Sequence, residues 1–452
     1  MVNRITVAFA CATVVVACSG SSDASETPST SATAMTIAPF ICDSTDHPQF
    51  SLACSQLERA GAAIVAEEFE ESLVIAEDLI AEHEDGGDED LQVVVAIAMG
   101  VKAESLHELG RDEESLFVLE SVIAQYGDWP GQQMDLPVGG AMAFQGQVLR
   151  KLGRVEESHA ALDLVIDRFG DTTDPLLAGP VATAFGNKGQ MYSDEGDWEM
   201  ALIQFEEIVV RYGDTTDLAV DRVVAFALGQ KGSVLLALGR LEESLTISEE
   251  FIDRYGDDHD PGKANHVAGV LENQAVALDV LERFEEAIVA NDELIARYGD
   301  RSDLDLLEQV AKAKLRNGEA LEDLGRFEEA IIVYEEVITE YGDTSDPDLD
   351  LWIARAMVGK GATLVWLGRL EESVVAFDEM IARYGDTVES QLKFQLVLAQ
   401  YFRALSLEIL GRFDEAIVAY KELIAQYGTT TDPNLTPLIS LVRESLDGLD
   451  ES

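Results

Sequence analysis

Carboxylates are the most abundant chemically capable side chains in this sequence, and several of them lie three residues apart. The sets are Asp171 with Asp174, Asp214 with Asp217, and Asp343 with Asp346 and Asp348. Calcium takes six to eight oxygen ligands, and dedicated loops space them as Asp-x-Asp-x-Asp-Gly, a spacing these segments lack. The second aspartate of each set is suited instead to capping the first turn of a helix. We therefore expect no metal site in these segments.

The sequence does not carry the residue patterns of an enzyme. Its histidines are scattered along the chain, at His47, His83, His107, His159, His259 and His266. It has no glycine-rich phosphate loop and no nucleophile elbow. Paired glutamates such as Glu242-Glu243 recur at regular intervals, so they belong to a repeated structure and not to one active site. We expect no catalytic residue and no cofactor.

An aromatic residue followed by glycine recurs every 43 residues and sets the framework for these side chains. The copies are Tyr126-Gly127, Phe169-Gly170, Tyr212-Gly213, Tyr255-Gly256, Tyr298-Gly299, Tyr341-Gly342, Tyr384-Gly385 and Tyr427-Gly428. A degenerate copy, from Ile80 to Asp85, lies one period earlier. Nine copies with almost no insertions predict a stack of similar supersecondary modules.

Each copy has the pattern of two helices separated by a tight turn. In one typical copy, apolar residues at three- and four-residue spacing predict helices over residues 304–324 and 327–341. Gly325 gives the turn a permissive backbone, and Gly342 ends the second helix. Aspartate as the cap and proline in the first turn then begin the next helix. These pairs are Asp174-Pro175, Asp260-Pro261, Asp346-Pro347 and Asp432-Pro433.

Small residues recur at two fixed places in every copy. Seven residues before the turn stand Ala103, Gly146, Gly189, Gly232, Ala275, Gly318, Gly361 and Ala404. Five residues after it stand Ser115, Ser158, Ala201, Ser244, Ala287, Ala330, Ser373 and Ala416. Small side chains at these two points allow the paired helices to approach closely. In this respect the copies resemble the tetratricopeptide repeat (TPR) family, whose order and spacing are matched in one copy by Gly318, Gly325, Phe327 and Ala330.

The resemblance covers nearly the whole chain, from about Ser51 to Gly428. It implies an all-α, TPR-like α-solenoid of about nine helix-turn-helix repeats across residues 41–433. Residues 434–452 are expected to form a capping helix and tail, because the open end of a solenoid needs a polar cover. The period departs from the family pattern, at 43 residues against about 34. We assign the surplus to a longer first helix and to an acidic connector.

The net charge narrows the class of partner. Acidic residues number 86 against 31 basic residues, giving a formal charge of −55. Such a field repels nucleic acid and anionic lipid headgroups, so we expect no nucleic-acid partner. Three interpretations of the acidity stay open: a solvated surface suited to salt, a docking face for a basic partner, and diffuse binding of divalent cations.

The N-terminus has the features of a bacterial export signal. Residues 1–17 combine Arg4 with an apolar stretch too short to span a bilayer. Ala17-Cys18 resembles a lipobox, which implies cleavage before Cys18 and a lipid on its sulfur. Residues 18–40 are rich in Ser, Thr and Ala and are predicted to be a flexible tether. The alternative is an ordinary secretory signal, and in both cases we expect an extracytoplasmic protein on the bacterial cell envelope, with a lipid as its only membrane attachment.

Two further cysteines in the mature chain can form a disulfide. Cys42 and Cys54 are an even pair in an oxidising compartment, which favours a bond between them. The alternative is two free buried thiols.

The TPR resemblance implies that the first helices line a concave face that binds a peptide or protein. The candidate binding residues there are Glu104, His107, Gln147, Arg150, Gln190, Ser233, Glu319, Glu322, Val365 and Tyr401. These positions vary from copy to copy, as a recognition surface or an unconstrained surface would. A further set forms a candidate donor ladder just before the small residue: Lys102, Lys188, Lys231, Lys360 and Arg403. The ladder either attracts an acidic ligand or passes over the core to neighbouring acceptors.

These observations predict a non-catalytic, lipid-anchored scaffold for protein–protein interaction. One alternative is an assembly factor of the envelope or outer membrane, by resemblance to TPR lipoproteins. A second is an enzyme or solute-binding protein, which would need a closed pocket with converging titratable groups.

Overall fold

The computed structural model describes residues 48–84, 86, 88–130, 132–172, 174–256, 261–299, 304–342, 347–387 and 389–450. In these residues the chain forms nineteen α-helices, α3 to α21, with two short 3-10 helices and no strand. The predicted all-α fold is confirmed. The predicted signal peptide, Cys18, the tether and Cys42 lie outside the described residues. None of the described helices has the length and hydropathy needed to cross a membrane.

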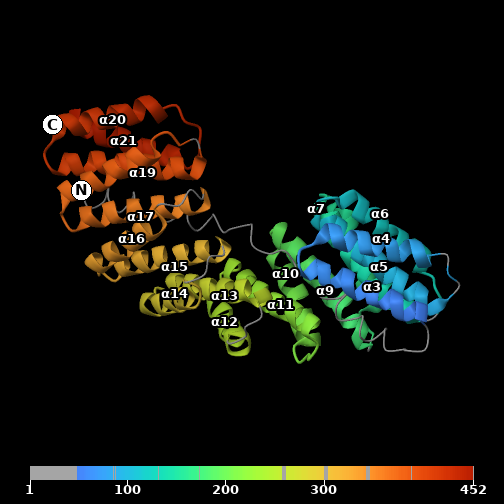
Figure 1. The fold of residues 1–452 in the computed structure, drawn as a ribbon. Helices are drawn as coiled ribbons and strands as arrows, with labels where there is room; N and C mark the ends of the chain where they lie inside the picture. Colours follow the sequence, from blue (N-terminus) through green and yellow to red (C-terminus); the bar gives the residue numbers. More distant parts are fainter. Residues whose placement is uncertain are drawn as a thin grey trace. The chain divides into compact units, whose positions relative to one another are not determined.

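The chain divides into two compact units, which we call the N-terminal unit (described residues to 270) and the C-terminal unit (from 271). The N-terminal unit contains α3 (Pro48–Val65), α4 (Phe69–His83), α5 (Glu89–Glu108), α6 (Asp112–Tyr126), η1 (Gln132–Met134), α7 (Asp135–Lys151), α8 (Val155–Phe169), η2 (Pro175–Leu177), α9 (Ala178–Asp194), α10 (Trp198–Tyr212), α11 (Leu218–Ala237) and α12 (Leu241–Tyr255). The boundary falls within α13 (Pro261–Val280). The C-terminal unit continues with α14 (Phe284–Tyr298), α15 (Leu304–Asp323), α16 (Phe327–Tyr341), α17 (Pro347–Trp366), α18 (Leu370–Tyr384), α19 (Ser390–Ile409), α20 (Phe413–Tyr427) and α21 (Leu435–Asp450). Figure 1 shows the first unit in blue to green and the second in yellow to red.

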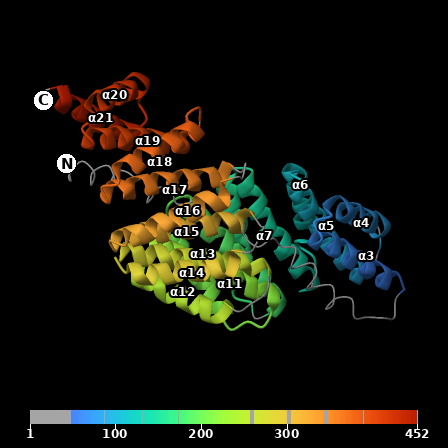
Figure 2. The same ribbon diagram turned by 60° about the vertical axis from the view of Figure 1, so that its left-hand side comes forward.

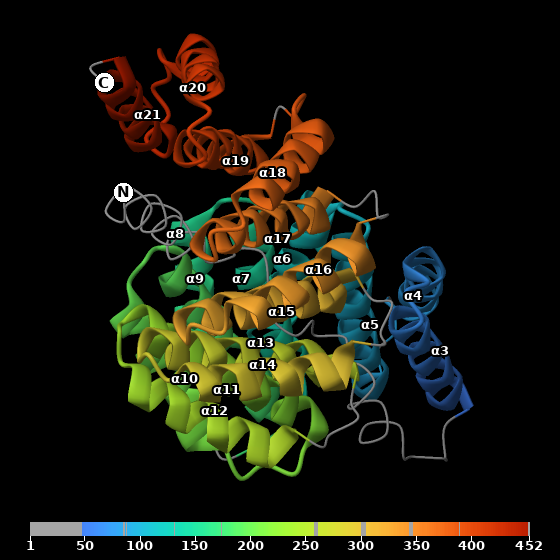
Figure 3. The same cartoon turned by 90° about the vertical axis from the view of Figure 1, so that its left-hand side faces the viewer.

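Within each unit, helices alternate between the first and the second helix of a repeat. Helices that follow one another pack together, as α3, α4 and α5 do in Figure 3. First helices of neighbouring repeats also contact each other: α3 with α5, α5 with α7, α7 with α9 and α9 with α11 in one unit. In the other unit α15 contacts α17 and α17 contacts α19, and these three helices are labelled in Figure 2. This layered contact between neighbouring repeats is the arrangement expected of an α-solenoid.

The turn inside each repeat requires a left-handed backbone. Gly325 has φ of +72°, and the turn glycines of the other copies lie between +70° and +77°. Glu67 and Glu282 occupy the same place in copies without glycine, with φ of +59° and +57°. A side chain in this conformation costs about 1 kcal/mol relative to glycine. Packing of the two helices therefore imposes the turn even where its residue is unfavourable.

The small residue of the first helix is matched to a partner sixteen residues later. A Cβ placed on Gly318 would lie 2.4 Å from the ring of Tyr334. Sixteen residues after Gly232 stands the small Ser248, and the nearest atom to a Cβ on Gly232 is Cγ2 of Ile247 at 3.9 Å. Overlaps like that of Gly318 occur at Gly146 with Leu162, Gly189 with Phe205, and Gly361 with Phe377. Glycine is thus required in these four copies, whereas Ala103 and Ala404 stand sixteen residues before the large side chains Leu119 and Tyr420 in copies that accommodate a methyl group.

Two first helices begin differently from the long helix of the typical copy. The segments before α7 and α9 are the 3-10 helices η1 and η2. Pro137 and Pro180 lie at the third position of α7 and α9, and proline has no N–H to donate to a carbonyl four residues earlier. The α-helix therefore begins after η1 and η2 and not before them. Asp174 caps η2 as predicted, because its side chain accepts from Leu176 N–H at 3.0 Å.

The connectors that lengthen the repeat are tied to each other by arginine. The arginine before the aromatic-Gly pair donates to the glycine carbonyl of the preceding connector, 41 residues earlier. These bonds join Arg168 to Gly127, Arg211 to Gly170 and Arg254 to Gly213. The first two measure 3.0 and 2.6 Å. Because the connector carbonyl is an end group of a helix, the cation also meets the negative end of a helix dipole.

The two ends of the described chain agree with parts of the sequence expectation. The C-terminal helix α21 buries Leu438, Ile439 and Val442, which cover the last repeat. Cys54 is buried in α3 and disulfide-bonded. Its expected partner, Cys42, lies outside the described residues, so that pairing stays a prediction.

Candidate functional site

The candidate donor ladder is occupied by contacts within the protein. Each cation pairs with a carboxylate 25 residues earlier, on the second helix of the preceding repeat. The pairs are Lys102 with Glu77, Lys188 with Asp163, Lys231 with Glu206, Lys360 with Glu335, and Arg403 with Asp378. Three of the nitrogen–oxygen distances are 2.8 Å, 3.2 Å and 2.9 Å, for Lys102, Lys231 and Lys360. These cations join neighbouring repeats and do not stand as free donors for an acidic ligand.

Half of the predicted binding residues lie inside the protein. Glu104, His107, Gln147, Val365 and Tyr401 are buried. His107 is engaged with Asp112, at 2.5 Å between Nδ1 and Oδ1. The partly exposed residues are Arg150, Gln190, Ser233, Glu319 and Glu322. The expectation that all ten line an open face is corrected here, because a side chain packed between helices cannot meet a partner.

The N-terminal unit presents a first-helix face with short side chains and local polar bonds. Arg150 Nη1 donates to Asp194 at 3.0 Å, and Gln190 Nε2 donates to the same carboxylate at 2.9 Å. Three residues before the small residue of each copy stand Gly100, Ala143, Gly186 and Gly229. This face therefore offers few side chains of its own to hold a ligand.

The C-terminal unit has an aromatic and charged cluster on α15 and α17 that the sequence did not reveal. We call Glu308, Lys312, Glu319, Trp352 and Arg355 the Trp352 cluster. Trp352 Nε1–H donates to Glu308 Oε1 at 3.0 Å. Lys312 Nζ and Arg355 Cζ lie 5.0 and 5.1 Å from the centre of the indole ring, within the range of cation–π attraction. The indole therefore holds two cations in place.

Carboxylates complete the Trp352 cluster and face outward. Lys312 pairs with Glu308 at 2.8 Å, and Arg355 donates to Glu319 at 2.8 Å. The side chains of Glu319 and Glu308 are 42% and 30% exposed, whereas those of Arg355 and Lys312 are 12% and 11% exposed. A partner approaching this face meets carboxylate oxygens first. The arrangement suits a cationic or N–H-donating ligand.

Glu322 lies on the same helix and has an unusual protonation state. Burial raises the pKa of its carboxyl to about 8, and repulsion from Glu319 and Asp323 acts in the same direction. The Thr363 hydroxyl donates to it across neighbouring repeats. Burial likewise raises the pKa of Asp279 on α13 to about 7, although Arg316 opposes the shift. Part of the acidity of this face is therefore neutral near pH 7.

In the last three repeats, the residue at the position of Glu322 and the large residue twelve positions later differ together. Tyr420 OH donates to Glu408 at 3.0 Å, and Tyr334 stands in the same relation to Glu322. The repeat between them has the apolar pair Val365 and Phe377, both buried. In these three copies the phenol occurs with a carboxyl partner, because a buried phenol without a partner is unfavourable.

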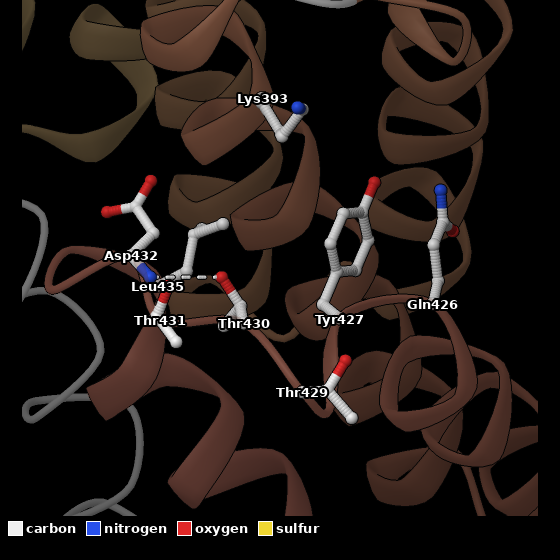
Figure 4. Close-up of a pocket in the computed structure, with 8 residues that line it drawn as sticks. All are labelled: Lys393, Gln426, Tyr427, Thr429, Thr430, Thr431, Asp432 and Leu435. Atoms are coloured by element: carbon white, nitrogen blue, oxygen red, sulfur yellow. Dashed lines mark hydrogen bonds between the residues drawn. The ribbon is translucent and has the colours of Figure 1, made fainter.

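A pocket of about 580 Å³ lies at the last connector of the C-terminal unit. Figure 4 shows Lys393, Tyr427 and the Thr429–Asp432 segment around it. Asp432 N–H donates to Thr430 Oγ1 at 3.2 Å, and Asp432 in turn accepts from Asn434 N–H at 2.9 Å. Asp432 and Thr430 are therefore engaged in the turn that precedes α21.

Neither candidate face has the donor set of a metal centre. No group of three or more His, Cys, Asp or Glu side chains in the described part of the chain is placed to hold a metal ion. The second connector aspartate acts as a cap in two of the sets that suggested calcium: Asp174 accepts from Leu176 N–H at 3.0 Å, and Asp217 accepts from Ala219 N–H at 2.9 Å.

The sequence and the fold were compared with those of known proteins. Residues 272–345 match the model of a tetratricopeptide repeat. Among solved structures, the apo form of RapI is 8% identical over 79% of this chain and 98% of its own length, with a TM-score of 0.54. The apo quorum sensor NprR from B. thuringiensis is 14% identical over 77% of this chain and 91% of its own, with a TM-score of 0.47. A tetratricopeptide repeat protein from Parabacteroides merdae is 13% identical over 68% of this chain and 99% of its own, with a TM-score of 0.42. No curated protein matches the sequence.

Proposed function

We propose that this chain, whose residues 272–345 match a tetratricopeptide repeat, is a non-catalytic scaffold that binds a protein partner through its first helices. The observation that carries the proposal is the contrast between constant and variable positions. The turn, the small residues and the connector bonds recur from copy to copy, whereas the exposed side chains on the first helices change. In the C-terminal unit they form the outward-facing carboxylates of the Trp352 cluster.

The chemistry of this cluster favours a partner with basic or N–H-donating groups. Glu308 and Glu319 are more exposed than the two cations, and the indole and the cations hold their positions. Charged groups arranged in advance reduce the entropy lost on binding. The first helices of the N-terminal unit form an equivalent face, but its side chains are short. We therefore assign the main binding role to the C-terminal unit.

The proposal is tested by site-directed photo-crosslinking in the native envelope. A photoreactive residue in place of Glu319 should capture a defined protein, and one in place of Glu250, on the exposed face of a second helix, should not. Glu319→Gln with Glu308→Gln should weaken capture while the protein stays folded, with a thermal midpoint only slightly lowered because Arg355 and Lys312 lose their carboxylate partners. Equal capture from both positions would contradict a specific first-helix face.

We also propose that the scaffold is extracytoplasmic and anchored by lipid at Cys18. The support is the sequence Ala17-Cys18 after an apolar stretch, followed by a tether rich in Ser and Thr. Cys18→Ala should move the protein from the membrane to the soluble fraction of the envelope. If the variant stays with membranes, the lipid is not the attachment. A role in envelope or outer-membrane assembly would be favoured if the captured partner is an outer-membrane protein.

A further inference from the structure

The second helices of the C-terminal unit carry a periodic exposed apolar residue that the first-helix face does not explain. Val289, Ile332, Val375 and Val418 stand 43 residues apart and are 65%, 56%, 56% and 55% exposed. The equivalent series in the N-terminal unit is Val74, Phe117, Ala160, Ile203 and Thr246, which is interrupted by Ala160 and by Thr246. Exposed single aliphatics are ordinary on protein surfaces. Because the series recurs with the repeat, a binding site among these positions requires a further feature that distinguishes one of them.

One of these residues lies at a groove. A cleft of about 320 Å³ is lined by α16, α17 and α18. Its floor is formed by Ile331, Leu364 and Ala376, which make a small buried cluster of their own beside the main core. Val375 extends the apolar lining to the exposed surface of α18. The groove therefore has room and an apolar floor for an aliphatic side chain.

The rim of the groove is acidic and only partly neutralised. Arg369 forms two bonds to Glu372, at 2.8 and 2.6 Å, and Lys360 pairs with Glu335 at 2.9 Å. Within the described chain, Glu371 and Glu379 take part in no hydrogen bond or ion pair, although both line the groove and both are exposed. The charge of Glu371 interacts with that of Arg412 without a bond between them, so both carboxylates have oxygens available to cations from outside.

The spacing along α18 specifies the shape of the ligand. Glu371, Val375 and Glu379 are four residues apart, so they lie on one face of the helix about 6 Å apart along its axis. A helix laid beside α18 presents side chains at three- or four-residue spacing with the same rise. An extended segment would leave its backbone N–H and C=O groups without partners on a helical surface. The geometry favours a helix.

We propose that the groove between α16 and α18 binds an amphipathic, cationic helix of a partner protein. An aliphatic side chain of that helix enters the cleft over Leu364 and Ala376. A Lys or Arg on each side of it pairs with Glu371 and Glu379. The surface is separate from the first-helix face of the proposed function, so the two can fail independently.

The test uses the full-length protein and a synthetic helical peptide of about 18 residues, long enough to be helical in complex. The peptide carries a Lys-x-x-x-Leu-x-x-x-Lys stripe on an Ala/Gln background and a fluorescent label, and its affinity is measured by anisotropy near physiological salt. Glu371→Gln/Glu379→Gln should weaken binding about tenfold, since two exposed ion pairs are lost. Val375→Ser should weaken it about fivefold. A peptide with Glu in place of Lys should not bind.

The matched control is Asp414→Asn/Glu422→Gln on α20. It removes the same charge at the same spacing around Val418, but neither residue lines the groove. This variant should bind the peptide within about twofold of the original protein. Equal weakening by the two double variants, or no binding by the original protein, would overturn the proposal. Loss of binding in Trp352→Phe would place the peptide on the first-helix face and would also overturn it.

Discussion

The two units have the same frame, by which we mean the turn and the small residues that recur in each repeat. They differ in the side chains on their first helices. In the N-terminal unit, the position three residues before the small residue holds Gly or Ala in α5, α7, α9 and α11. In the C-terminal unit the same position holds Glu272, Leu315, Val358 and Tyr401. Glu272 binds Arg316 at 3.0 Å, and acidic groups nearby are buried enough to raise their pKa. The comparison indicates that the repeat accepts charged side chains on its first helices, although burying their carboxyl groups lowers the stability of the folded state.

Replacing the small glycine of the first helix with alanine should lower the free energy of unfolding in both units. Gly318→Ala and Gly189→Ala place a methyl group against Tyr334 and Phe205, and each should lower the free energy of unfolding by about 3 kcal/mol. Gly232→Ala has open space and should be neutral or stabilise by up to about 1 kcal/mol, because alanine favours the helix. Denaturant unfolding monitored by circular dichroism measures all three. A large loss in Gly232→Ala would refute the matching of small and large residues.

The free energies of unfolding of the two units should respond to pH in opposite directions. Burial raises the pKa of Glu322 and Asp279 in the C-terminal unit, so the folded state keeps protons that the unfolded state has lost. The free energy of unfolding of this unit should therefore fall, on the order of 2 kcal/mol, as the pH rises from about 4.5 to about 8. Burial lowers the pKa of His266 in the N-terminal unit, so stability there is lost as the pH falls below about 6.5.

Hydrogen exchange resolved by segment and corrected for intrinsic rates would show this contrast. Glu322→Gln should reduce the pH response of the C-terminal unit to the part due to Asp279 and leave that of the N-terminal unit unchanged. If both units respond to pH with the same sign, the assignment of the two groups is wrong.

The Trp352 cluster should make a smaller contribution to stability, confined to the C-terminal unit. Trp352→Phe removes the N–H that bonds to Glu308 and weakens the attraction of Lys312 and Arg355. We expect a loss of about 1 kcal/mol, measured as the unfolding midpoint of the C-terminal unit. Phe185→Leu is the comparison in the N-terminal unit, since Arg211 lies 5.1 Å from the ring of Phe185. An unchanged midpoint in Trp352→Phe would mean that the cluster is not ordered in solution.

The smallest effect is expected at the two turns that lack glycine. Glu282→Gly and Glu67→Gly relieve a left-handed backbone, and each should raise the free energy of unfolding by about 0.5 kcal/mol. Because one position lies in each unit, equal gains would indicate that the turn is set by the repeat. A gain at only one of them would mean that the neighbouring helices impose different strain.

The features that were predicted from the sequence are those fixed by local backbone physics. Gly325, Asp174 before Pro175 and the small residue at Gly318 each have a conformation or a size that few residues satisfy. The Trp352 cluster was not predicted because its bonds join residues 36 to 44 positions apart on different helices. A repeat interval gives the spacing of such residues but not the rotation of one helix against the next.

The same limit explains why part of the expected binding face is buried. Glu104 and Glu319 occupy the same position in their repeats, yet the first is buried and the second is partly exposed. Exposure depends on the side chains of the neighbouring helices, which differ between copies. The exposed series at Val289 and Val375 was missed for a related reason: an apolar residue on a predicted amphipathic helix is normally assigned to the core.

The arginine bond between connectors has a consequence for how the chain can change in length. Arg211 reaches Gly170 and Arg254 reaches Gly213, each across 41 residues. If the 43 residues from 171 to 213 were removed, Arg254 would stand 41 residues after Gly170 and could take over its bond. A whole copy can therefore be lost or duplicated in one genetic event without leaving an unmatched end. We expect relatives of this protein to differ in length by multiples of one copy.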